Sequence, residues 1–177
     1  MQIVSSNPPL NVLFLCTGNS ARSIIAECIT NRLGAAKFRG YSAGSQPRGN
    51  INPHALAVLR KSNFDVSQLR SKSWDEFAGP EAPKARLRLH RLRRLGEGGC
   101  PIWPGQPMSA HWGLPDPAKA QGTEAEQGLA FADGFRMLYQ RISIFVSLPF
   151  DKLTKLSLQK HLDEIGQTEA VVTKQSA

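Results

Sequence analysis

Residues 12–23 read VLFLCTGNSARS, an apolar run that ends on a cysteine and continues into a loop containing one glycine. The run predicts a buried strand over Asn11–Leu15 that carries Cys16 to the edge of a parallel sheet. A helix is expected to follow over about Ala21–Leu33. Backbone N–H groups of such a loop and of a helix N-terminus converge on anions, so the stretch predicts an anion-binding site.

Two side chains of this stretch make the predicted site reactive. Arg22 adds a planar guanidinium that fits a tetrahedral oxyanion. The same positive field favours the thiolate form of Cys16, which is the nucleophilic form. The spacing alone is weak evidence, because the chain has three cysteines and 13 arginines. The order of strand, cysteine, loop, arginine and helix predicts attack on phosphate or a similarly shaped anion. A purely structural cysteine is the alternative.

The first predicted helix packs against the sheet through a stripe of apolar side chains, and Gly34 is expected to end it in a left-handed conformation. Cys28 lies on that stripe, so it is interpreted as part of the core and not as a redox partner of Cys16. A second, short strand is expected over Phe38–Ser42.

Helix-capping residues predict the other helices. Asn52, followed by proline, opens a helix that runs to about Ser62, with His54 expected on its solvated surface. The capping box Thr-x-x-Glu at residues 123–126 opens a long helix that Pro149 ends.

Asp151 is expected to cap one more helix. Four apolar side chains of that helix are expected to face the core: Leu153, Leu156, Leu162 and Ile165.

Strands that alternate with helices predict an α/β fold, a three-layer doubly wound sheet of about four parallel strands flanked by helices. Ligands of such sheets bind beyond the carboxyl ends of the strands, which is where Cys16 is expected. We expect a single domain over residues 1–166 and a polar tail over residues 167–177.

Composition narrows the functional class. With 177 residues, no run of transmembrane length and no signal-peptide pattern, the protein is expected in the cytoplasm and away from membranes. Its three cysteines lack metal-type clustering, so no metal is expected and the thiols are expected to do chemistry. A net charge of +8 is typical of nucleic-acid binding, but five of the arginines lie within residues 86–94. The basicity is therefore local, and no nucleic-acid partner is expected.

Residues 16–23 resemble the C-x5-R-S phosphate loop of low-molecular-weight protein tyrosine phosphatases and of the arsenate reductases built on that fold. The resemblance covers roughly residues 10–166. Five further segments resemble the reductase branch and occur in its order: YSAGS at 41–45, LRSKSWDEF at 69–77, CPIWPG at 100–105, HWG at 111–113 and DP at 116–117.

The resemblance implies roles for the site residues. Cys16 would attack arsenate held by Arg22 and the loop, and Asp116 would protonate the departing oxygen as general acid. Cys100 would resolve the Cys16–arsenic adduct and leave a disulfide. The implied anion-binding residues are Thr17, Gly18, Asn19, Ser20, Ala21, Arg22 and Ser23, with Ser23 donating to the thiolate and Asn19 holding the shape of the loop. The alternatives are an ordinary turn residue for Asp116 and inert packing for Cys100.

The segment from residue 85 to about residue 95 departs from this pattern. It should form the third, central strand, yet it reads ARLRLHRLRRL, and a charged side chain on a covered face costs several kcal/mol. Read one base later, its degenerate codons can encode LDFVFTVCD, the strand pattern of the family. We hypothesise out-of-frame translation here, with the frame restored before Cys100. Leu92 stands where the family has its middle redox cysteine.

The resemblance implies no bound cofactor. It implies arsenate or a phosphate-like oxyanion as ligand, and an external thiol reductant, namely glutathione, glutaredoxin or thioredoxin. Without a cysteine at position 92, either that reductant acts directly on the site or the chain is impaired. A tyrosine phosphatase that forms a cysteinyl-phosphate, and an oxyanion-binding module without catalysis, are the alternative functions.

Overall fold

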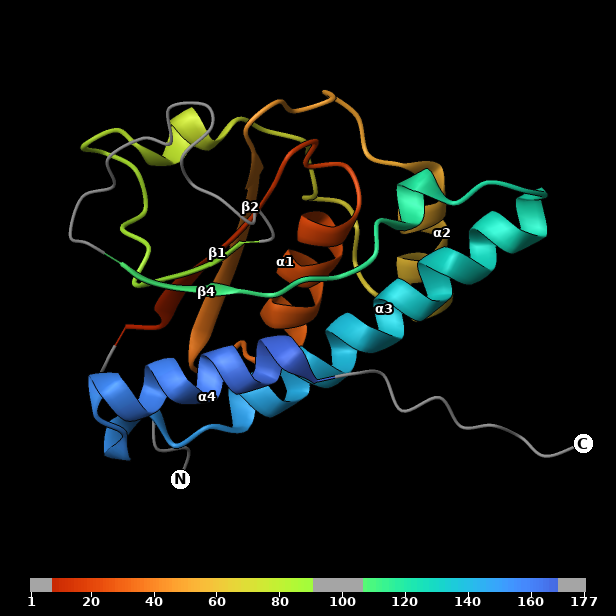
Figure 1. Ribbon diagram of the computed structural model, residues 1–177. Coiled ribbons are helices and arrows are strands. Elements are labelled where there is room, and N and C mark those ends of the chain that lie inside the picture. Colours follow the sequence, from red (N-terminus) through yellow and green to blue (C-terminus); the bar gives the residue numbers. More distant parts are fainter. Residues whose placement is uncertain (1–7, 91–106, 169–177) are drawn as a thin grey trace, which may run out of the picture.

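Four parallel strands form one sheet in the computed structural model, which describes residues 8–90 and 107–168 (Figure 1). The strands are β1 (Leu10–Cys16), β2 (Phe38–Gly44), β3 (Leu87–His90) and β4 (Met108–His111). The α-helices are α1 (Arg22–Leu33), α2 (Pro53–Lys61), α3 (Glu124–Ser147) and α4 (Lys155–Gln167). Short 3-10 turns lie at η1 (Trp74–Phe77), η2 (Pro117–Lys119) and η3 (Phe150–Lys152). The predicted α/β class and the predicted strands are confirmed.

The strand order places the end of β1 at a functional position. The order is β2-β1-β3-β4, so the chain winds away from β1 in both directions. The register pairs Cys16 with Gly44 of β2, and His90 of β3 lies level with Leu15. The carboxyl end of β1 is thus the point where the winding direction reverses, which is where open α/β sheets bind their ligands.

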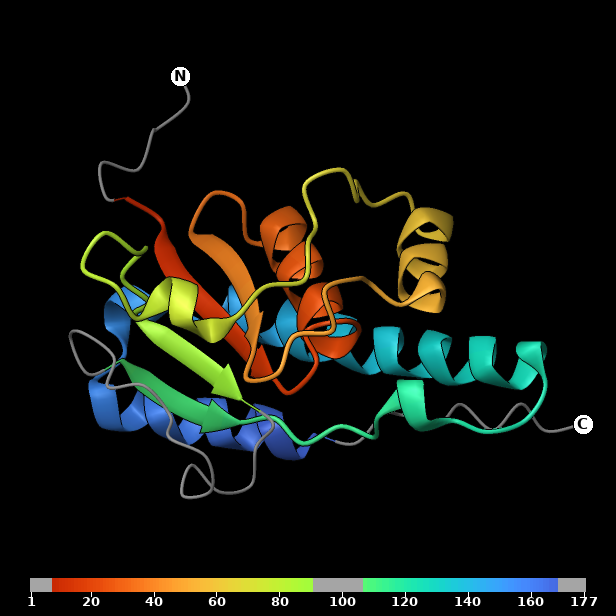
Figure 2. The same cartoon turned by 90° about the horizontal axis from the view of Figure 1, so that it is seen from above.

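The two faces of the sheet are covered differently. On one face, Val12, Phe14, Leu87 and Leu89 pack with α1, α3 and α4 in the main core. On the other, a smaller cluster joins Leu13, Leu15 and Ala43 to Trp74 and Phe77 of η1. Figure 2 shows η1 in front of the strands, with α3 and α4 behind them. The predicted three layers are present, with a short turn and loops forming the third in the described part of the chain.

Most predicted helix starts are confirmed. The Asn52 side chain accepts a hydrogen bond from the N–H of His54 at 2.9 Å, and α2 follows. Thr123 and Glu126 form the complete capping box of α3, which ends before Pro149. His54, however, is not a solvated side chain as predicted. Its ring stacks on Phe131 of α3 at a centroid distance of 5.4 Å.

The predicted cap of the last helix is wrong. Asp151 lies in η3, and Thr154 caps α4 by accepting from the N–H of Ser157 at 3.2 Å. Leu156 precedes Leu162 by six residues, so it lies on another face of α4 and is 83% exposed, whereas Leu162 and Ile165 are buried as predicted. Helix α4 reaches Gln167, and the rest of the predicted tail from residue 169 lies outside the described residues.

Gly34 ends α1 for a different reason from the one predicted. Its φ is −105°, which is not left-handed. A Cβ at this position would lie 3.0 Å from both the Phe38 ring and the Thr30 carbonyl oxygen, and 3.1 Å from Val146. Close packing, and not backbone conformation, thus favours glycine there. Cys28 lies in the main core, as predicted.

Residues 87–90 of the arginine-rich segment form strand β3 at the predicted place. Leu87 and Leu89 are buried, Arg86 precedes the strand and is exposed, and Arg88 is half-buried. The conflict expected from the alternating pattern is therefore reduced, since the Arg86 side chain is exposed even though its backbone hydrogen-bonds to Asn11 of β1 and Met108 of β4. The out-of-frame reading stays a prediction, and position 92 lies outside the described residues. None of the described helices combines the length and apolar character needed to span a bilayer.

Candidate active site

The loop after β1 presents its carbonyl groups to one side. The carbonyl oxygens of Cys16, Thr17, Gly18 and Ser20 accept backbone hydrogen bonds from Ser45, Gln46, Arg48 and Asn52 respectively, at 2.8–3.2 Å. In a trans peptide the N–H lies opposite the C=O, so the N–H groups that follow these carbonyls face away from residues 45–52. The connection after β2 thereby turns the loop amides inward, as the prediction of an anion-binding loop requires.

Gly44 allows this contact between the loop and β2. A Cβ at Gly44 would lie 2.4 Å from the carbonyl oxygen of Thr17 and 3.0 Å from the backbone nitrogen of Asn19. No side chain fits in that space without displacing the loop backbone. Asn19 adopts a left-handed φ of 40°, which asparagine tolerates better than most residues.

Helix α1 begins beneath the loop without a side-chain cap. Its N-cap residue, Ala21, makes no side-chain hydrogen bond to the first turn. The first N–H groups of a helix have no partners within the helix, and an anion is one of the groups that can satisfy them.

Hydrogen-bond donors surround the sulfur of Cys16. The N–H of Asn19 donates to Sγ at 3.2 Å, and Oγ of Ser23 lies 2.9 Å from Sγ. The Nδ2 group of Asn19 donates to Oγ of Ser23 at 2.9 Å, so that oxygen already serves as an acceptor and its proton can be directed to sulfur. Donors of this kind stabilise a thiolate more than a thiol. The roles expected for Ser23 and Asn19 fit this geometry.

Arg22 and Asp116 meet beside the loop. Nη2 of Arg22 lies 2.8 Å from Oδ2 of Asp116, and Nη1 donates to the Leu114 carbonyl at 3.1 Å. Asp116 also accepts from the N–H of Ala118 at 3.2 Å and so caps η2. Turn residue and site residue are thus compatible roles for Asp116. The guanidinium fork is engaged by protein groups here, so an anion would have to share or displace them.

Cys16 and Arg22 line one small cavity of about 30 Å³. Phe14, Leu89 and Trp112 of the main core form part of its wall. Trp112 is fixed there because its indole N–H donates to the Leu162 carbonyl at 3.0 Å. The structure therefore brings the predicted nucleophile and guanidinium together against an apolar wall.

A buried polar network that the sequence analysis did not predict supports the loop from below. Nζ of Lys72 lies 3.3 Å from Oε2 of Glu27, and Oγ of Ser42 donates to the same oxygen at 2.5 Å. Asn19 joins this network, because its Nδ2 donates to Ser42 and its Oδ1 accepts from the N–H of Lys72. In the sequence, the sign of this network was Glu27, a glutamate that stands among apolar residues of the predicted first helix.

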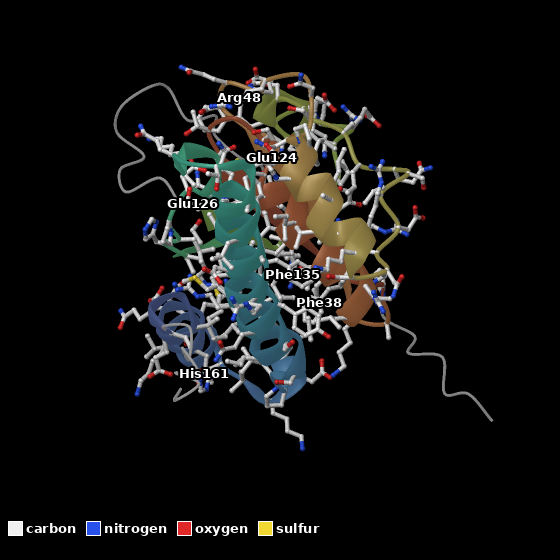
Figure 3. The ribbon with its side chains drawn as sticks, turned by 90° about the vertical axis from the view of Figure 1, so that its right-hand side faces the viewer. Phe38, Arg48, Glu124, Glu126, Phe135 and His161 are labelled. Carbon is white, nitrogen blue, oxygen red and sulfur yellow. The ribbon has the colours of Figure 1, made fainter. Side chains whose placement is uncertain are left out.

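A second guanidinium, that of Arg48, lies next to the loop after β1. The side chain of Arg48 covers Gly18, where a Cβ would be 3.3 Å from Nε of Arg48. Figure 3 shows Arg48 at the same end of the molecule as Glu124 and the first turn of α3. This exposed arginine, which the sequence analysis also missed, extends the positive field over the loop.

The other two cysteines are Cys28, which lies in the main core, and Cys100. Burial raises the pKa of Cys28 to about 11, and the charges of Glu27 and Asp65 act in the same direction. Cys100, the predicted resolving thiol, lies outside the described residues. Within residues 8–90 and 107–168, no group of three or more histidine, cysteine and acidic side chains could hold a metal ion.

Known proteins resemble this chain in sequence and in fold. The family model for low molecular weight phosphotyrosine protein phosphatase matches residues 11–82. An arsenate reductase of Oceanobacillus iheyensis is 34% identical over 134 residues, which are 76% of this chain and 93% of that protein.

Two solved structures show the same fold. An arsenate reductase in the reduced state is 25% identical with a TM-score of 0.60, covering 78% of this chain and 97% of the other. The tyrosine phosphatase Wzb from Escherichia coli K30, in complex with sulphate, is 22% identical with a TM-score of 0.61, covering 77% and 95%.

Proposed function

This chain belongs to the arsenate reductases built on the low molecular weight phosphatase fold, and on that basis we propose that it reduces arsenate to arsenite with Cys16 as nucleophile. The observation that carries the proposal is the position of the Cys16 sulfur, which accepts from the N–H of Asn19 inside a loop of inward-turned amides beside Arg22. A thiolate in that position meets a bound tetrahedral anion at its central atom.

Arsenate binding rests on the loop and the first turn of α1. The N–H groups of residues 17–23 and the Arg22 guanidinium supply donors on one side of the oxyanion. Arg22 is held by the Leu114 carbonyl and Asp116, so arsenate competes with Asp116 for it. Once released from that ion pair, Asp116 is beside the anion and can act on its oxygens.

Two chemical steps follow from this arrangement. In the first, the Cys16 thiolate attacks arsenic(V), an S–As bond forms and one As–O bond breaks, and the hydroxyl group of that bond leaves as water after it takes a proton from Asp116. In the second, another thiolate attacks Sγ of Cys16, an S–S bond forms and the S–As bond breaks. The electron pair of that bond stays on arsenic, which is reduced to arsenic(III), while the two sulfurs are oxidised to a disulfide.

The second step needs another thiol. Cys28 is excluded because it is buried in the core with a pKa of about 11. We propose Cys100 as the resolving thiol, and glutathione, a glutaredoxin or a thioredoxin as the external reductant. Because position 92 is leucine, a relay to a third cysteine there is absent, and the reductant must act on the Cys16–Cys100 disulfide or on the adduct itself.

The same residues would support a second activity. Cys16, Arg22 and Asp116 suffice to hydrolyse a phosphomonoester through a cysteinyl-phosphate, with no redox thiol. The ion pair between Arg22 and Asp116 favours this candidate, because both steps of hydrolysis need an acid or base within reach of the held anion.

The two activities separate in one set of assays. Purified full-length protein is incubated with arsenate plus each thiol system, and separately with an aryl phosphate. We expect arsenite release that is lost in Cys16→Ser and strongly reduced in Cys100→Ser. Turnover of the aryl phosphate that survives Cys100→Ser, without arsenite release from any thiol system, would instead identify a phosphatase.

A further inference from the structure

A buried arginine on α3 joins two separate segments of backbone near the candidate site. Arg141 is 4% exposed, and within the described part of the chain its guanidinium donates to backbone carbonyls. Nη1 donates to the Gly113 carbonyl at 3.0 Å, whereas Nε and Nη2 donate to the Thr168 carbonyl at 3.3 and 2.8 Å. Burial lowers the pKa of Arg141 from its ordinary value, although arginine stays charged in proteins. A buried cation held by neutral carbonyls costs free energy, so stability alone does not explain an arginine at this position.

The Thr168 end of this bridge is fixed by the packing of α4. Thr168 is the C-cap residue of α4, and Figure 2 shows that helix running beside β4. The last turn of α4 touches the end of the strand, because a Cβ at Gly166 would lie 2.4 Å from the carbonyl oxygen of His111. Arg141 therefore ties Gly113 to both α3 and α4.

The Gly113 end of the bridge begins the segment that carries the proposed acid. We call residues 113–116 the acid segment, since they run from this glycine to Asp116. The next carbonyl along, that of Leu114, accepts from Nη1 of Arg22, whose Nη2 lies 2.8 Å from Asp116. Two guanidiniums from different helices, α1 and α3, thus hold adjacent carbonyls of one short segment.

A bound anion affects these two anchors differently. Arg22 lines the cavity beside Cys16, so an oxyanion there engages its guanidinium and weakens its hold on the acid segment. Arg141 is not among the described residues that line this cavity, so its bridge does not compete with the anion. The acid segment therefore keeps one anchor at the stage of the reaction that needs the acid.

We infer that Arg141 is a positioning residue for the general acid: its bridge between Gly113 and α4 keeps Asp116 beside Arg22 before the anion binds and beside the anion afterwards. The inference rests on the proposed role of Asp116 as general acid. Asp116 competes with the anion for Arg22, so loosening the acid segment should strengthen anion binding and weaken proton transfer.

The first measurement is the dissociation constant of inorganic phosphate, obtained from protection of Cys16 against iodoacetamide in the full chain. Arg141→Met should lower this constant about threefold, because a loosened Asp116 competes less well for Arg22. Asp116→Asn removes the competing charge, so adding Arg141→Met to that variant should change the constant by less than about 1.5-fold. General damage to the site would instead weaken phosphate binding in both backgrounds.

The second measurement separates kcat from KM, for arsenite release or, if the chain is a phosphatase, for hydrolysis of an aryl phosphate. Arg141→Met should lower kcat about tenfold because the acid is displaced, while KM should stay within about threefold of the wild type. Arg136→Met is the matched control, because Arg136 lies on the same helix, is exposed and pairs with Asp133. It should leave kcat, KM and the phosphate constant unchanged.

An Arg141→Met protein with the phosphate affinity of the wild type would overturn the inference, and so would a change that persists in the Asp116→Asn background. If Arg141→Met does not fold, Arg141→Gln decides the question, since its shorter side chain has one donor nitrogen and cannot bridge the two carbonyls. A wild-type phosphate constant in Arg141→Gln overturns the inference. Phosphate binding needs no turnover, so the expected pattern in a protein that releases no arsenite would count against the proposed function alone.

Discussion

The two described cysteines show that burial alone does not determine how a thiol behaves. Cys16 is 5% exposed and Cys28 is 7% exposed. The sulfur of Cys16 accepts from the N–H of Asn19, beside the N-terminus of α1. The thiol of Cys28, which lies in α1, donates to the Asp65 carbonyl at 3.4 Å and has Glu27 as an acidic neighbour. Hydrogen-bond donors face the sulfur at the first position, whereas burial and acidic groups favour a neutral thiol at the second.

The largest expected effect is the loss of activity when Cys16, but not Cys28, is replaced by serine. Cys16→Ser should lower arsenate reduction at least about 10³-fold, because the hydroxyl is a far weaker nucleophile. Cys28→Ser should keep kcat within about threefold and lower stability by about 1 kcal/mol, since a hydroxyl is then buried in the core. Initial rates of arsenate reduction measure the change in activity, and thermal unfolding measures the change in stability. Comparable activity losses in both variants would show that the contrast between the sulfurs is not functional.

Asp116→Asn tests the acid at the reactive cysteine and should have the next largest effect. Loss of a positioned general acid lowers kcat about 10²-fold. The same change frees Arg22 from its ion pair at 2.8 Å, so inorganic phosphate should bind more tightly as a competitive inhibitor. The measurement is kcat together with the phosphate inhibition constant. A lower kcat with weaker phosphate binding would show that Asp116 helps to hold the anion instead.

Local sequence predicted the parts of the fold that depend on neighbours in the chain. The apolar run before Cys16, the cap at Asn52 and the capping box at Thr123 each lie where they were expected. The last helix was misplaced because Asp151 and Thr154 are both good caps three residues apart. Choosing between them depends on the η3 turn after Pro149, which local preference does not specify.

The site could be predicted only in part, for a related reason. Cys16 and Arg22 are six residues apart, so one motif contains both. The network beneath them joins Glu27, Ser42 and Lys72, which come from α1, β2 and the loop before η1. These three side chains meet only because their elements pack against one another, and that packing cannot be read from one sequence.

Gly44→Ala should have a smaller effect than loss of the acid, and it tests the loop itself. The added methyl would lie 2.4 Å from the Thr17 carbonyl oxygen, so the loop must move. We expect a loss of about 1–3 kcal/mol in stability and about tenfold in the alkylation rate of Cys16, with Cys28 unaffected. Gly79→Ala is the matched control, because nothing lies within 4 Å of its added methyl. Equal alkylation rates in the two variants would contradict the close contact between Gly44 and the loop.

The smallest expected effect concerns Cys28 and appears only at alkaline pH. Its pKa is raised from 9.0 to about 11, chiefly by burial, so between these values the folded chain binds more protons at Cys28 than the unfolded chain does. Stability must therefore fall as pH rises through this window, by on the order of 1 kcal/mol. Cys28→Ala should lower stability at every pH but should show a shallower decline from pH 9 to 11. Urea unfolding of both proteins across that window measures the two slopes, and parallel slopes would mean that Cys28 ionises as readily in the core as in the unfolded chain.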